Sequence, residues 1–173
     1  MINIRKGTFE TNSSSTHSIC ITKSDEKCKI PEELRINIQN YEFGWEYEEY
    51  GSTDEKFAYL IMGIVAGYND NFLEVSQKLD KIIKTVGQWV KDVNIRGLNL
   101  VCYNQSIYYD TWDGYVDHSS ELYELVDELL NNEEMLKRYL FSDDSFILTG
   151  NDNEDGYPTI VATYDHDEFY KGN

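Results

Sequence analysis

The chain has 173 residues, of which 40% are hydrophobic and 14% aromatic, and this composition excludes wholesale disorder and allows one domain with a buried core. It carries 32 acidic and 15 basic residues, and its formal net charge of −17 opposes direct binding to the phosphates of nucleic acid. Three scattered cysteines fit neither a disulfide framework nor a zinc spacing, and we expect no signal peptide and no membrane-spanning segment. We therefore expect a cytoplasmic protein that binds no membrane, needs no cofactor and has an oligomeric state that the sequence leaves open.

The first forty residues predict strands around one polar loop. Residues 2–9 and 18–22 have the alternating pattern of half-buried strands, and together they predict a hairpin with the polar run 11–18 at its tip. Residues 31–33, a proline followed by two glutamates, are suited to open a short helical turn. Residues 34–38 then return to the strand period.

The middle of the chain predicts two helices. Ser52 or Thr53 is a suitable N-cap for a mostly apolar helix over residues 57–66, which Gly67 would end. Apolar residues at helical spacing predict a longer amphipathic helix over residues 71–93. These two helices are expected to form a helical hairpin that serves as core scaffold.

The last third of the chain predicts two further hairpins and a helix pair. Strands are predicted over residues 98–103 and 106–109, and again over 145–149 and 159–164; helices are predicted over 121–130 and 133–141. No linker or internal repeat divides the chain. We therefore predict a single α+β domain over residues 1–173, in which antiparallel β-hairpins pack against a helical hairpin and a C-terminal helix pair.

The run from Thr11 to Ser18 concentrates hydroxyl, carboxamide and imidazole groups more densely than any other stretch. One interpretation is a solvated hairpin loop, because such side chains satisfy the backbone of turns. The other is a site. If the fold brings the run together with other polar groups, the cluster could support a small hydrolase or transferase, or hold a divalent metal. The candidate catalytic residues of this alternative are Glu10, Ser13, Ser15, His17 and His118.

The string RKGTFETNSSSTHSICI, at residues 5–21, also carries a resemblance. It resembles the N-terminus of a group of uncharacterised proteins from phages and prophages of Gram-positive bacteria. Shorter similarities lie at residues 43–46, 116–120 and 150–153, so the likeness spans most of the chain. The resemblance implies a phage or mobile-element origin and brings no activity with it.

The acidic residues fall in two blocks, with net charges of −6 over residues 41–70 and −14 over 105–173. Within the first block, residues 41–50 interleave five aromatic residues with four glutamates. This segment is either an interaction surface with aromatic anchors or an amphipathic strand whose rings complete the core. The charge itself has a plainer interpretation too, since a high net charge keeps a small protein soluble.

Our leading hypothesis is an acidic protein of phage or mobile-element origin that inhibits a host nucleic-acid-handling defence machine. It would act like an anti-CRISPR protein, by mimicking nucleic acid in the basic groove of a nucleic-acid-binding partner. The alternatives are the hydrolase or transferase described above and a phage accessory protein with neither role. The residues expected to contact the partner are Glu42, Trp45, Glu46, Glu48, Glu49, Asp143 and Asp144.

Overall fold

A computed structural model describes most of the chain and confirms the predicted α+β class. The residues that it describes are 15–44, 46–68, 71–98, 100–103, 106–109, 115–116, 122–151 and 169–171. The α-helices in this part are α1 (Thr53–Gly67), α2 (Phe72–Val86), α3 (Leu122–Asn131) and α4 (Glu133–Phe141). The strands are β1 (Ser15–Cys20), β2 (Glu33–Asn37), β3 (Glu42–Phe43), β4 (Glu48–Tyr50), β5 (Asp92–Arg96), β6 (Leu100–Tyr103), β7 (Ser106–Tyr109), β8 (Tyr115–Val116), β9 (Phe146–Asn151) and β10 (Phe169–Lys171), and a 3-10 turn, η1, spans Ile38–Asn40.

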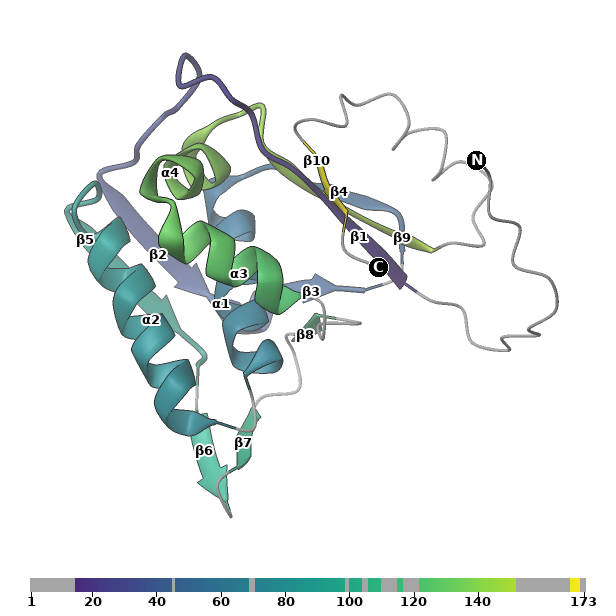
Figure 1. Ribbon diagram of the computed structural model, residues 1–173, viewed down its shortest axis with the longest axis vertical. Coiled ribbons are helices and arrows are strands. Elements are labelled where there is room, and N and C mark those ends of the chain that lie inside the picture. The colour runs from purple at the N-terminus through teal and green to yellow at the C-terminus, as the bar shows by residue number, and fades with distance from the viewer. Residues whose placement is uncertain are drawn as a thin grey trace, which may run out of the picture.

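The largest sheet has the strand order β10-β1-β9-β4 and is antiparallel throughout. Figure 1 shows it beside the group of four helices. Two predicted hairpins are wrong, because β1 and β9 pair with each other. Residues 18–20 are flanked on both sides by β9 and β10, which leaves them no free edge for residues 2–9, and β9 has β1 and β4 as its partners. The predicted partner strands, residues 2–9 and 159–164, lie outside the described residues.

Two strand pairs are parallel, which the sequence did not predict. β2 pairs with β5, and β3 pairs with β8. The first pair corrects two local predictions. Residues 31–33 form no helical turn, because Glu33 already pairs with Asp92. The second predicted helix ends at Val86 rather than at residue 93, because the chain turns there and enters β5. The β6–β7 hairpin is antiparallel, as predicted.

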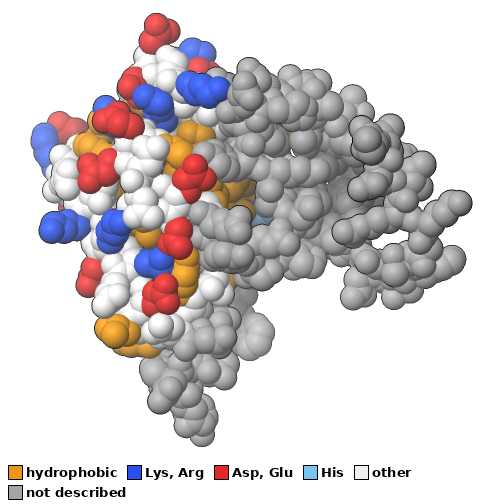
Figure 2. Space-filling view, viewed as in Figure 1, with side chains coloured by type: hydrophobic (Ala, Val, Ile, Leu, Met, Phe, Trp, Pro, Cys, Tyr) orange, Lys and Arg blue, Asp and Glu red, His pale blue; other side chains and the backbone are white. Residues whose placement is uncertain are grey.

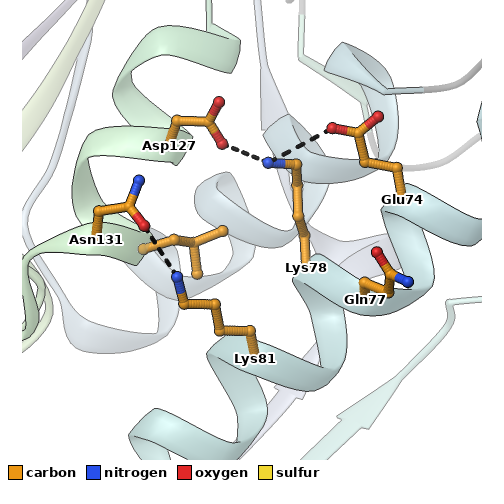
Figure 3. A pocket seen from close by; sticks show the side chains of 7 residues that line it. Glu74, Gln77, Lys78, Lys81, Asp127 and Asn131 are labelled. Carbon is orange, nitrogen blue, oxygen red and sulfur yellow. Dashed lines mark hydrogen bonds and ion pairs between the residues drawn. The ribbon is translucent and has the colours of Figure 1, made fainter.

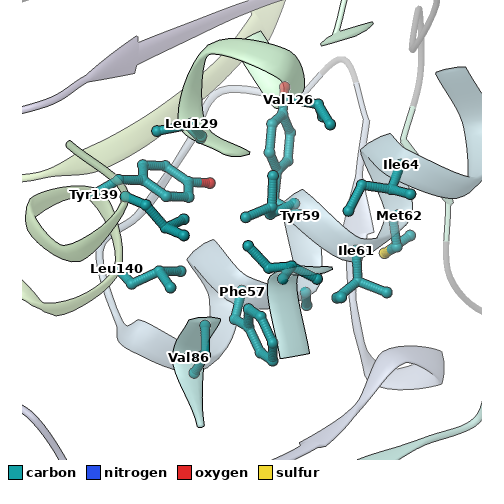
Figure 4. Close-up of a cluster of buried hydrophobic side chains, with 14 of the residues drawn as sticks. Phe57, Tyr59, Ile61, Met62, Ile64, Val86, Val126, Leu129, Tyr139 and Leu140 are labelled. Atoms are coloured by element: carbon teal, nitrogen blue, oxygen red, sulfur yellow. The ribbon is translucent and has the colours of Figure 1, made fainter. Parts of the chain in front are cut away.

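Helix α1 lies at the centre of the core. Ten consecutive residues of it, from Lys56 to Val65, are buried, so the helix is enclosed on all sides rather than on one face. It packs against α2, α3, α4 and β2. Figure 4 shows side chains of α1 meeting those of the other three helices. Its start is fixed by a capping box between Ser52 and Glu55, and Ser52 is one of the two N-cap residues that the sequence predicted.

The predicted C-terminal helix pair is also confirmed. Helix α4 begins after Asn132, whose side chain accepts a hydrogen bond from the backbone N–H of Met135. None of the helices in the described part of the chain is both long enough and apolar enough to cross a membrane.

Candidate functional site

The most distinctive charged surface is the acidic segment, which we define as residues 42–55. It holds six carboxylates, and no basic residue occurs between Arg35 and Lys56. The side chains of Glu42, Glu46, Glu48 and Glu49 are exposed. Lys56 does not offset them at the surface, because it is only 1% exposed. Four of the residues predicted to contact a partner are therefore solvent-accessible and lie within residues 42–49. Trp45 lies outside the described residues.

The acidic segment contains two short paired strands and ends in the first turn of α1. β3 pairs with β8, whereas β4 is an edge strand of the large sheet and pairs with β9. Beneath the segment, Phe43 is fully buried. Its ring makes edge contacts with Tyr50, at 4.7 Å between centroids, and Tyr59, at 4.9 Å. The core-completing interpretation of the aromatic residues thus holds for Phe43, while Tyr47 is exposed.

The backbone of the segment receives hydrogen bonds from side chains of the large sheet. His17 Nε2 lies 3.2 Å from the Gly44 carbonyl oxygen, and Thr149 Oγ1 donates to the Glu46 carbonyl at 2.8 Å. The Tyr50 hydroxyl lies 2.9 Å from the Glu42 carbonyl and also contacts the Glu48 carboxylate. The segment is therefore attached to the sheet through carbonyl groups, while the residues Glu42, Glu46, Glu48 and Glu49 are exposed.

Three titratable groups in or beside the segment have raised pKa values. Burial raises the pKa of Asp54, and the nearby Glu55 carboxylate adds to this rise. Burial also raises the pKa of Tyr41, with contributions from Asp54 and Glu55, and that of Tyr50, with the Glu48 carboxylate as the next cause. Each shift is of the sign that disfavours a further negative charge. Burial is the largest cause of all three shifts, and neighbouring carboxylates add to each of them.

The second predicted patch, Asp143 and Asp144, is exposed but neutralised. Asp143 pairs with Lys29, and Asp144 pairs with Lys27 at 2.8 Å. The hydrogen bond from Lys29 lowers the pKa of Asp143. Figure 2 shows the same mixing on a larger scale, with basic and acidic side chains interspersed over one face of the described part. Asp143 and Asp144 are therefore part of a local ion-pair cluster and contribute little net charge.

The candidate catalytic residues are not assembled into a site by the described part. His17 lies in β1, is 5% exposed and has the Tyr59 hydroxyl 3.0 Å from Nδ1 in addition to its contact with Gly44. It is a core residue rather than a loop-tip imidazole. Ser15 opens the same strand, whereas Glu10, Ser13 and His118 lie outside the described residues. Among the side chains that the structure places, no three His, Cys, Asp or Glu residues are grouped to hold a metal ion.

A hollow of about 290 Å³ between α2 and α3 was not predicted. Lys78 pairs there with Asp127 and Glu74, and Lys81 donates to the Asn131 side chain at 3.0 Å (Figure 3). The spacing of residues 74, 78 and 81 on one helical face was the available signal. Lys78 also lies 4.1 Å above the Tyr68 ring and is 16% exposed. The charges of this hollow balance one another, which is typical of a helix junction.

Comparisons with known proteins add no identity to this geometry. Neither a protein-family model nor a curated protein nor a solved structure matches the chain.

Proposed function

We propose that this chain is an acidic inhibitor that binds a nucleic-acid-handling defence machine, such as a CRISPR effector, in the bacterial host of a phage or mobile element. The acidic segment would occupy the basic groove of that partner in place of nucleic acid. The resemblance of residues 5–21 to phage and prophage proteins is the ground for the host context. The mode of binding is argued from the charge.

One observation carries the proposal: the exposed glutamates of the acidic segment lack basic partners among the described residues. The ion pairs of the described part involve other carboxylates, such as Asp25, Glu32 and Asp127. The basic groove of a nucleic-acid-binding protein attracts phosphate groups and other anions. Carboxylates that are held on an ordered backbone can take the place of these anions. Binding of this kind steers association and weakens with salt.

The test begins with capture of the tagged full-length chain from a bacterial lysate that contains a candidate defence system, with washes at low and high salt. We expect a stoichiometric partner with a basic groove, retained at low salt and released at high salt. The affinity of the purified partner is then measured against a triple variant, Glu42→Lys, Glu46→Lys and Glu49→Lys. We expect this variant to bind at least tenfold more weakly and with a flatter salt dependence.

The matched control places the same charge change elsewhere on the surface. It combines Glu26→Lys, Asp80→Lys and Asp92→Lys, which are exposed residues outside the acidic segment. Because both triple variants have the same net charge, a local interface predicts weak binding for the first and nearly unchanged binding for the second. Equal affinities for the two variants would contradict the proposal.

A further inference from the structure

Alternate carbonyl groups of the acidic segment, those of residues 42, 44 and 46, face side-chain donors of the large sheet. Gly44 and Glu46 lie in the connection between β3 and β4, outside both strands. Here His17 and Thr149 supply hydrogen bonds that a neighbouring backbone would otherwise supply. The Tyr50 hydroxyl has one proton, which it shares between the Glu42 carbonyl and the Glu48 carboxylate.

The contact between His17 and Gly44 determines which nitrogen of the imidazole carries a hydrogen. A carbonyl oxygen can only accept, so Nε2 must carry the hydrogen that it donates to Gly44. In the neutral imidazole, Nδ1 is then an acceptor, and it takes the hydrogen of the Tyr59 hydroxyl at 3.0 Å. Tyr59 belongs to the buried helix α1. The orientation of the imidazole is therefore set from the core, and its Nε2 hydrogen is directed at the Gly44 carbonyl.

The two donor residues occupy paired positions on neighbouring strands of the sheet. His17 in β1 is directly opposite Thr149 in β9, and Thr149 is in turn opposite Glu48 in β4. His17 is 5% exposed, and Thr149 is fully buried. Both hydrogen bonds therefore join the segment to buried side chains of the sheet.

We propose that His17 and Thr149 are positioning residues that hold the backbone carbonyls of Gly44 and Glu46 in place and so preorganise the acidic segment. The fixed conformation is a property of this chain alone; its use in binding rests on the proposed function. A segment that is already ordered does not lose conformational entropy when it meets a rigid partner. This role also accounts for a histidine in a polar run without assigning it any catalysis.

The first experiment measures local opening without a partner. The full chain and its variants are digested under native conditions with a glutamate-specific endoprotease, and cleavage after Glu42 and Glu46 is compared with amide exchange of residues 43–47. Thr149→Val keeps the shape of the side chain and removes the donor, whereas Thr149→Ser keeps the hydroxyl. We expect roughly fivefold to tenfold faster cleavage for the valine variant and a rate near wild type for serine.

Tyr139→Phe is the matched control, because it also removes one buried hydrogen bond, that from the Tyr139 hydroxyl to the Lys56 carbonyl at 2.9 Å. It should leave cleavage after Glu42 and Glu46 unchanged. His17→Phe should reproduce the opening seen with Thr149→Val; if it does not fold, the two Thr149 variants still decide. Equal cleavage of Thr149→Val and Tyr139→Phe would overturn the positioning role.

Partner affinity separates the two proposals. If Thr149→Val opens the segment and also weakens the partner, both the positioning role and the interface are supported. If it opens the segment while affinity stays at the wild-type value, the positioning role stands and the acidic segment is not the binding surface.

Discussion

At Lys56, an ammonium group lies inside the core with backbone carbonyls as its partners. Nζ donates to the carbonyls of Ser142 and Ser145, at 2.7 and 2.8 Å. Burial lowers the pKa of Lys56 to about 8, against an opposing contribution from Asp143. The lysine therefore ties the first turn of α1 to the connection between α4 and β9, and it does so while carrying a proton that the unfolded chain would bind more tightly.

This arrangement predicts that stability rises with pH above neutrality. Between the folded pKa of Lys56 and its ordinary value of 10.5, the unfolded chain binds more protons than the folded one, so the free energy of unfolding increases with pH. From about pH 7.5 to about pH 9.5 the gain is about 2 kcal/mol. Urea denaturation at these pH values should show the gain in wild type and lose it in Lys56→Met.

Lys84→Met, at an exposed lysine of α2, is the control and should keep the wild-type slope. The comparison between variants removes the contributions of other titrating groups. Lys56→Met should also be less stable than wild type at every pH, because it leaves two buried carbonyls without their donor. Parallel slopes for wild type and Lys56→Met would show that Lys56 does not titrate in this range.

Sequence patterns identified the residues of the polar run but assigned them the wrong surroundings. A string of hydroxyl and imidazole groups is typical of a loop, and residues 15–18 are nevertheless part of a central strand. The partners that make His17 compatible with burial, Gly44 and Tyr59, are 27 and 42 positions away in the chain. Local pattern cannot supply such partners. The exposure of the glutamates was easier to predict, because four carboxylates in ten residues exceed what a core can accommodate.

Gly97 directly follows β5, at the end of the parallel β2–β5 pair. It has a φ of 79°, a region that residues with a Cβ rarely adopt. An added Cβ would lie 2.6 Å from Oδ1 of Asn37 and 2.8 Å from Cγ of Gln39. We expect Gly97→Ala to lower the free energy of unfolding by about 1–3 kcal/mol, measured by urea denaturation.

The control for this prediction is Gly51→Ala, where an added Cβ would meet no atom within 4 Å and φ is not in the left-handed region. That variant should change stability by less than about 0.5 kcal/mol. If both variants were equally stable, the strain at Gly97 would not be a feature of the folded protein.

A helix or strand was predicted correctly where the residues that determine its bounds lie close together in the sequence. Helices α1 and α4 have capping side chains and apolar spacing within a few residues, and their bounds followed from these. Helix α2 was predicted too long, because Trp89 and Val90 continue its spacing. What ends it is the pairing of β5 with β2, which are separated in the chain by α1 and α2. Parallel pairs always need such long connections, so the sequence pattern did not reveal them.

Charge could be counted from the sequence but not placed by it. The residues whose side chains the structure describes include 19 acidic and 12 basic residues, a net charge of −7 out of −17. Much of this charge is locally paired, as at Lys27 and Asp144, whose side chains are 61% and 43% exposed. Exposed pairs of this kind contribute little to stability. The acidic segment stands apart because no basic residue occurs in the chain between Arg35 and Lys56.

The balance between these pairs and the excess of carboxylates predicts how salt acts on stability. With 32 acidic and 15 basic residues, repulsion outweighs attraction over distances longer than a single pair. Raising the ionic strength from about 0.01 M to about 0.15 M shortens the screening length from about 30 Å to about 8 Å, which suppresses this repulsion while contact pairs lose less. We expect Tm to rise by about 2–4 °C in a thermal melt, as for a gain of about 1 kcal/mol in the free energy of unfolding.

A variant with Glu42→Gln, Glu46→Gln and Glu49→Gln should show a smaller rise in Tm, since it lacks three of the repelling charges. A Tm that falls with added salt would show instead that the ion pairs dominate, and the acidic segment would then lack the uncompensated field on which its proposed attraction to a basic groove depends.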